Sequence, residues 1–171
     1  MVRMQASVMA PAFSRLMQTV VLAISLVVAG TIAAAADHPA PLTGTVTVKT
    51  KYSFDALASR VEKAVSDHQM GLVAQASASR GAAARGVKIP GNVVLMVFRN
   101  DYAVRMLSAS VPAGIEAPLR LYITENPDGT ASLTYRTPSA VFAPYASPAL
   151  GEMAKELDAV FENIVRDAAS R

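Results

Sequence analysis

The sequence predicts an α+β fold, a two-layer domain in which helices cover one face of a partly antiparallel sheet. Two observations predict it. Apolar residues recur with the 3.6-residue period of a helix in some segments and alternate, as in a strand, in others. The elements follow in the order β-α-β-β-α-β-β-α, and a tight turn between two of the strands makes at least part of the sheet antiparallel.

The first part of the domain contains two strands around a helix. Residues 45–51, "TVTVKTK", alternate and predict a half-buried strand. Ser53 is expected to cap a helix whose apolar stripe extends to His68, and Gly71 to end that helix in the left-handed conformation. Residues 72–77 then form the second strand.

The central strand is expected at residues 92–98, "NVVLMVF", which are apolar without alternation. Such a strand presents apolar side chains on both faces. A short helix is expected to follow over 99–110, with Asn100 or Asp101 at its start.

The stretch 111–138 is expected to form two strands joined by a turn. Its two alternating segments are 119–124 and 131–136, and "NPDG" between them suits a type I turn, with Pro127 second and Gly129 fourth. After this hairpin, Ser147 caps a long amphipathic helix that begins at Pro148.

The first 36 residues are typical of a secretory signal peptide. Arg3 and Arg15 supply positive charge, residues 20–29 are apolar, and Ala34 and Ala36 fit the small-residue cleavage pattern. We therefore expect a signal peptide over 1–36, a proline-rich linker over 37–45 and the α+β domain over 46–170. The mature protein would be periplasmic or secreted.

An uncleaved inner-membrane anchor is the alternative for the same segment. The apolar run over 16–36 approaches the ~20 residues that a membrane span needs, although it ends in alanines and not in a basic cluster. Contact with a membrane is expected only if the leader is retained.

The charge balance of the chain gives no support for nucleic acid as a partner. The 171-residue chain has 16 Lys and Arg against 13 Asp and Glu, and loss of the two leader arginines leaves a net charge of about +1. Nucleic-acid binding, which needs a concentrated basic patch, has no support. The chain contains no cysteine, so no disulfide can form.

Several motifs spread over residues 46–170 resemble the 302nd domain-of-unknown-function family, a group of small bacterial α+β domains. The most specific are Ala113-Gly114, Ala117-Pro118-Leu119, Gly129, and Tyr135 with Pro138, all in or beside the hairpin. The resemblance implies an α+β fold and a dimer, and it implies no activity.

Two segments depart from the family's pattern. Where family members often carry a histidine, this chain has Arg80 within "SRG", and "FRND" replaces a Gly-Asn-Pro after the central strand. If that histidine serves a site in the family, this chain lacks it or replaces it with Arg80.

No catalytic constellation is expected. Ser66, Asp67 and His68 are adjacent on one helix and point in different directions, so they cannot form a triad. We interpret His68 as a partly buried histidine with a favourable place at the helix end.

No metal site and no cofactor are expected either. Two histidines without cysteine make a metal site improbable. Of the eight methionines, four lie in the leader region, whereas Met96, Met106 and Met153 fit apolar faces, which favours core packing.

Two surfaces remain as candidate binding sites. Arg80, Arg85 and Lys88 lie in a Gly-rich loop that could hold a small anion, although a solvated loop is the simpler interpretation. The second surface is the sheet face away from the helices, expected to pair two copies of the chain. Its candidate interface residues are Val94, Met96, Phe98 and Tyr122.

The sequence therefore predicts a non-enzymatic module of the cell envelope that binds a small ligand or a partner. The alternatives are an enzyme that acts on a small anionic substrate at the Arg80–Lys88 loop, and a structural assembly protein.

Overall fold

A computed structural model describes residues 40–170 of the chain, which form one compact unit. The expected signal peptide and residues 37–39 of the expected linker lie outside the described residues. No helix among those described is long and apolar enough to cross a membrane.

The described residues contain five strands and five α-helices, with two short 3-10 helices between them. The strands are β1 (Thr45–Lys49), β2 (Gly71–Ala76), β3 (Asn92–Phe98), β4 (Leu119–Glu125) and β5 (Ala131–Arg136). The helices are α1 (Phe54–Asp67), α2 (Ala78–Ala83), α3 (Asn100–Ala109), η1 (Val111–Glu116), α4 (Pro138–Phe142), η2 (Ala143–Tyr145) and α5 (Pro148–Ala169).

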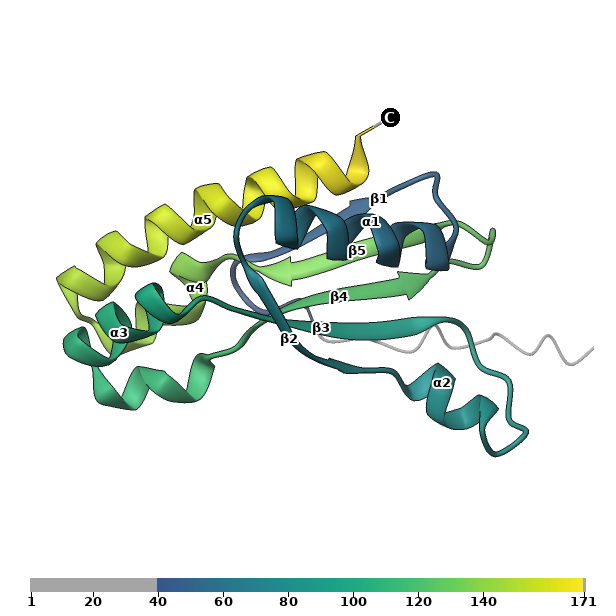
Figure 1. Cartoon of the computed structure of the whole chain (residues 1–171), viewed down its shortest axis with the longest axis horizontal. Helices are drawn as coiled ribbons and strands as arrows, with labels where there is room; N and C mark the ends of the chain where they lie inside the picture. Colours follow the sequence, from purple (N-terminus) through teal and green to yellow (C-terminus); the bar gives the residue numbers. More distant parts are fainter. Residues whose placement is uncertain (1–39, 171) are drawn as a thin grey trace, which may run out of the picture. The chain divides into compact units, whose positions relative to one another are not determined.

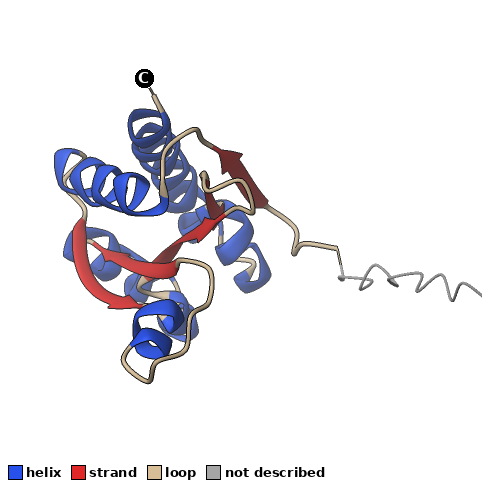
Figure 2. Ribbon diagram, turned by 90° about the vertical axis from the view of Figure 1, so that its right-hand side faces the viewer, coloured by secondary structure: helices blue, strands red, loops and turns tan. Residues whose placement is uncertain are grey.

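The strands form a single sheet in the order β1-β5-β4-β3-β2, and every neighbouring pair is antiparallel. The predicted α+β class is confirmed, and the sheet is more fully antiparallel than the hairpin alone indicated. Helices α1 and α5 cover one face, α3 and α4 lie at one end of the sheet, and α2 lies at the other end (Figures 1 and 2).

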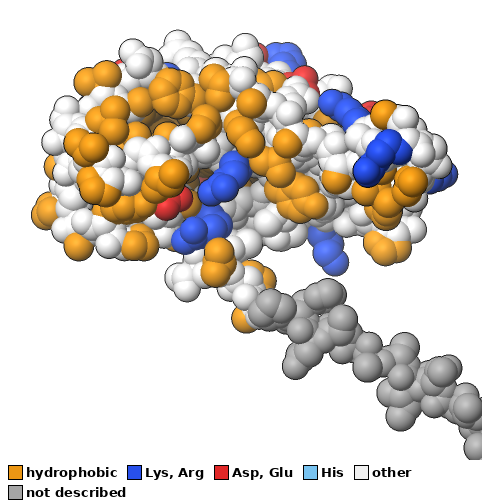
Figure 3. Space-filling view, turned by 90° about the horizontal axis from the view of Figure 1, so that it is seen from below, with side chains coloured by type: hydrophobic (Ala, Val, Ile, Leu, Met, Phe, Trp, Pro, Cys, Tyr) orange, Lys and Arg blue, Asp and Glu red, His pale blue; other side chains and the backbone are white. Residues whose placement is uncertain are grey.

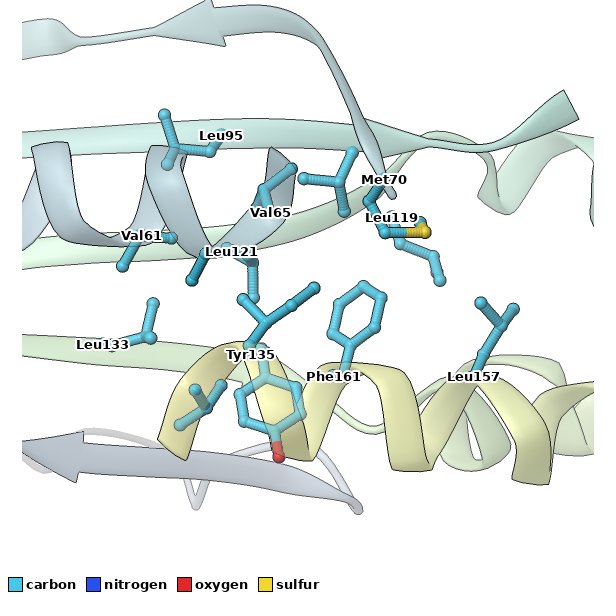
Figure 4. Packing of buried hydrophobic residues seen from close by; sticks show 14 of the residues in the cluster. Val61, Val65, Met70, Leu95, Leu119, Leu121, Leu133, Tyr135, Leu157 and Phe161 are labelled. Atoms are coloured by element: carbon cyan, nitrogen blue, oxygen red, sulfur yellow. The ribbon is translucent and has the colours of Figure 1, made fainter. Parts of the chain in front are cut away.

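The core lies between the sheet and the pair α1 and α5. In β3 the side chains of Val93, Leu95 and Val97 are buried, while those of Val94, Met96 and Phe98 are only half-buried. Phe161 of α5 packs against the Tyr135 ring of β5 with their centroids 5.8 Å apart. Figure 4 shows how Leu133, Leu121 and Leu95 line the helix-facing side of three neighbouring strands.

The helix ends differ in part from their prediction. Ser147 caps α5 as expected, since its side chain accepts a hydrogen bond from the Leu150 amide. Ser53 occupies the N-cap position of α1, but its hydroxyl makes no capping bond. The left-handed residue after α1 is Gln69, with φ of 59°, and Gly71 already begins β2.

The stretch 111–138 also differs from its prediction. Its first six residues form η1 and not a strand, whereas the hairpin of β4 and β5 forms as expected. Gly129 takes a φ of 79° in the turn and its amide donates to the carbonyl of Asn126 at 3.0 Å.

Candidate interaction surface

The sheet face opposite α1 and α5 is open to solvent and carries an apolar centre. Pairing in register places Met96 of β3 beside Arg120 of β4, and Val94 beside Tyr122. On the other side, Ala74 and Ala76 of β2 pair with the same two residues of β3. Because paired residues share a face of the sheet, these side chains form one surface.

We call Val94, Met96 and Tyr122 the open-face centre. The side chains of Val94 and Met96 are half-buried and that of Tyr122 is 40% exposed. No layer of helices in the described chain packs over this face of the sheet (Figures 1 and 2). Figure 3 shows hydrophobic side chains across this face, interrupted by basic groups. Exposed apolar patches on soluble proteins are commonly interaction sites or aggregation-prone surfaces.

Phe98, the fourth residue predicted for this surface, is half-buried like Val94 and Met96. It lies at the end of β3 and lines an apolar cavity beside Val97, Arg99 and Tyr102. Alternation along β3 puts Phe98 on the same side of the sheet as Val94 and Met96, and its place in the interface stays a prediction.

A polar rim surrounds the centre on the side of β5 and β1. The hydroxyls of Thr47 and Thr134 are hydrogen-bonded at 2.9 Å across these strands. On β4, Arg120 is exposed and lies 4.0 Å from the carboxylate of Glu116 in η1. The rim therefore carries both signs of charge.

A second exposed apolar group lies at the end of the molecule that carries α3 and η1. Val104 and Leu107 of α3 and Val111 and Ile115 of η1 are exposed, Ile115 by 82%. Figure 3 shows hydrophobic side chains at this end as well. The apolar surface is therefore larger than the sequence predicted, because η1 was not recognised as a helix.

The candidate anion loop is spread over α2 and the segment that follows it. Arg80, Arg85 and Lys88 are all exposed. Arg80 donates to the side chain of Gln75 at 3.3 Å, and Gln75 in turn donates to Glu62 of α1 at 2.9 Å. The Arg80 guanidinium is thus linked, through the side chain of Gln75, to the carboxylate of Glu62.

Lys88 lines a shallow hollow that neither Arg80 nor Arg85 lines. The hollow also contains Glu125, whose carboxylate accepts a hydrogen bond from the Gly91 amide at 2.7 Å. A carboxylate beside the lysine disfavours an anion there. Anion binding at the three basic residues stays a prediction.

His68 lies where the sequence placed it, half-buried at the C-terminal end of α1. Its Nε2 is 2.7 Å from the carboxylate of Asp167 in α5, and this hydrogen bond lowers the pKa of Asp167 below its ordinary value. This hydrogen bond therefore links the end of α1 to α5.

Other shifted pKa values in the described chain arise from ion pairs, from burial or, for the lowered pKa of Asp128, from hydrogen bonds to Thr130. The hydrogen bond to Arg99 lowers the pKa of Asp101, and the bond to Arg105 lowers that of Glu156. Burial raises the pKa of Tyr135. Arg99 and Arg105 both lie near the ring of Tyr102, at 4.2 and 5.4 Å from its centroid, so the two ion pairs form one surface cluster at α3.

Comparison with known proteins places this fold in a family. The family model described as "Domain of unknown function DUF302" matches residues 46–168. The chain belongs to the DUF302 family. This is the family that the hairpin motifs indicated, and its function is unknown.

A crystal structure of an uncharacterised conserved DUF302 protein from Bacillus stearothermophilus has the same fold. It superposes with a TM-score of 0.67 at 20% sequence identity, over 75% of this chain and 99% of that chain. No curated protein matches this DUF302 chain.

Proposed function

We propose that this DUF302 protein is an exported, non-enzymatic binding module of the cell envelope, and that its open-face centre pairs it with a second copy of itself. The observation that carries the proposal is the apolar centre at Val94, Met96 and Tyr122 on a sheet face that no layer of helices covers. An apolar centre with a polar rim is the usual anatomy of an interface.

A second copy of the chain fits this face better than a strongly acidic or a strongly basic partner does. Arg120 and Glu116 lie together on the rim, so each copy offers a cation and an anion. In a two-fold pairing, the same patch meets itself and therefore has to be self-complementary. A strongly acidic or basic partner would leave one of these charges opposed to its own sign.

Substitution of Met96 by lysine tests this proposal. In the pair, Met96→Lys places an unpaired charge at the centre of the interface, at a cost of several kcal/mol. Since 1.4 kcal/mol is a factor of ten, dimer dissociation constants should rise by about a hundredfold or more. Static light scattering and sedimentation of the purified protein measure this change.

Ser59→Lys is the matched control. Ser59 is exposed on α1, on the opposite side of the sheet, so the variant adds the same charge away from the open face. It should dimerise like the wild type. A wild-type protein that stays monomeric at high micromolar concentration, or a Met96→Lys variant that dimerises normally, would contradict the proposal.

Export is the second part of the proposal, and it is supported by the basic, apolar and small-residue pattern of the first 36 residues. Cleavage is expected between Ala36 and Asp37. N-terminal sequencing of the protein from the periplasmic fraction tests it. A chain that still begins at Met1 and sediments with membranes would favour the inner-membrane anchor instead.

A further inference from the structure

Three methionines that are distant in the sequence line one cavity. Met70 follows α1, Met106 belongs to α3 and Met153 to α5, and all three contribute to the wall of an apolar cavity of about 30 Å³ at the end of the sheet. The fourth methionine of the described residues, Met96, lies on the open face and does not line the cavity. Figure 4 shows Met70 beside Leu119, facing the layer of α5 that carries Leu157.

We propose that this cavity binds a soft monovalent metal ion, of the class of Cu(I) and Ag(I), through the thioether sulfurs of Met70, Met106 and Met153. Thioethers are soft, neutral ligands that select Cu(I) over hard cations. Each of the three side chains is long and unbranched, and its flexibility allows the sulfur to turn toward an ion.

The cavity is large enough for one water-sized occupant, yet it is a poor site for water. A buried water needs two to four polar partners, whereas the wall is formed by aliphatic, aromatic and thioether groups together with Arg99. Water gains few hydrogen bonds against such a wall, so a soft ion held by sulfur would have little bound water to displace.

Arg99 is the one positive charge in the wall, and its charge is already balanced. Its guanidinium donates two hydrogen bonds to the carboxylate of Asp101, at 2.8 and 3.1 Å. It also lies 4.2 Å from the centroid of the Tyr102 ring. Repulsion of an incoming monovalent ion is therefore reduced.

The remaining aromatic wall favours a cation. Phe98 and Phe142 line the same cavity, and neither ring is occupied by an arginine in the described structure. The negative face of an aromatic ring attracts a cation that has lost its water.

The experiment uses Ag⁺ as the probe, added as silver nitrate in a chloride-free buffer to the purified mature protein, which under the proposed export begins at Asp37 and so lacks the leader methionines. The mature protein has four methionines, at 70, 96, 106 and 153, and methionine-to-leucine variants assign their ε-methyl signals in the NMR spectrum. One equivalent of Ag⁺ should shift the signals of Met70, Met106 and Met153 together and leave that of Met96 unchanged. If the three cavity signals do not move, the proposal is wrong.

Calorimetric titration of leucine variants provides the second readout. Leucine keeps the volume of methionine and removes the sulfur, so the variants are expected to fold. Loss of an outer-shell partner alone costs about 10–100-fold in metal affinity, so Met106→Leu or Met153→Leu should weaken Ag⁺ binding at the cavity by at least about tenfold. Met96→Leu is the matched control and should bind like the wild type.

The pH dependence separates this site from histidine or carboxylate ligands. Those ligands must be deprotonated, so metal binding to them weakens as pH falls. A thioether does not titrate, and the affinity at the cavity should be the same at about pH 5.5 and 7.5. An affinity that falls about tenfold over this range, or leucine variants that bind like the wild type, would overturn the assignment.

Discussion

Arg60 offers a direct test of how the last helix is held to the rest of the fold. Its side chain extends from α1 to the C-terminal end of α5, where carbonyl groups lack helical partners. The guanidinium donates to the carbonyl of Ala168 at 2.7 Å, to that of Asp167 at 3.1 Å and to that of Ser170 at 2.7 Å. It also lies 4.4 Å from the centroid of the Tyr52 ring.

Substitution Arg60→Ala should lower the free energy of unfolding by about 2–3 kcal/mol. A hydrogen bond from a charged donor contributes about 1.5–3 kcal/mol when it is shielded from water. Only the bond to Ala168 is partly buried, so the two exposed bonds add much less than that. For a domain of this size, such a loss corresponds to a fall in melting temperature of roughly 10 °C.

Differential scanning calorimetry and chemical denaturation measure this effect. Arg60→Lys keeps the charge but cannot reach three carbonyls at once, so its stability should lie between those of the wild type and Arg60→Ala. Amide exchange should accelerate in the last turn of α5 in both variants.

Arg105→Ala is the matched control. Arg105 also reaches α5 and lies near a tyrosine ring, but it pairs with the exposed carboxylate of Glu156 and not with carbonyl groups. This exposed pair is bidentate and contributes at most about 1 kcal/mol, so the control should melt within a few degrees of the wild type and clearly above Arg60→Ala. If Arg60→Ala melts within about 2 °C of the wild type, the capping argument is refuted.

Two further predictions concern a glycine and an acidic residue. Gly44→Ala should destabilise the fold by about 2–4 kcal/mol, because Gly44 has a φ of 76° and an added Cβ would lie 2.1 Å from the Cβ of Ala140. Gly81 lies in α2 with open space around it, so Gly81→Ala should raise the free energy of unfolding by about 0.5–1 kcal/mol. Chemical denaturation measures both variants, and the same change in unfolding free energy for the two would contradict this reasoning. The hydrogen bond from His68 depresses the pKa of Asp167 in the folded state, so this contribution to stability is present above the unfolded pKa of about 3.9 and is lost as pH falls through the folded value. Asp167→Asn should therefore flatten the dependence of melting temperature on pH below about pH 4, and an unchanged profile would count against the pair.

Three strands could be predicted because their residues alternate, and β3 because it is a short apolar run. The hairpin of β4 and β5 alternates, and the turn at 126–129 has the residues that its geometry requires, so both are evident locally. The helices η1 and α4 were missed because six and five residues are too few to establish a helical period. The left-handed position at Gln69 was missed because glycine two residues later is the more usual helix terminator.

Long-range contacts were beyond the reach of periodicity. Arg60 falls on the polar side of its helix, which predicts a solvated side chain, but the carbonyl that it caps is 108 residues away. The methionines likewise satisfied their local apolar stripes, so core packing was the natural interpretation. Only the arrangement of α1, α3 and α5 around the end of the sheet brings Met70, Met106 and Met153 to one cavity.

The two proposed sites can be separated because they lie on opposite sides of the same strand. Met96 faces the open side of β3, whereas Val97 faces the core and lines the cavity. Met96→Lys should therefore abolish dimerisation and leave the Ag⁺-induced shift of the cavity methyl groups unchanged. Met106→Leu should weaken Ag⁺ binding and leave the dimer intact. If either variant lost both properties, its melting curve would show whether unfolding is the common cause, and a folded variant that lost both would mean that the two sites are not independent.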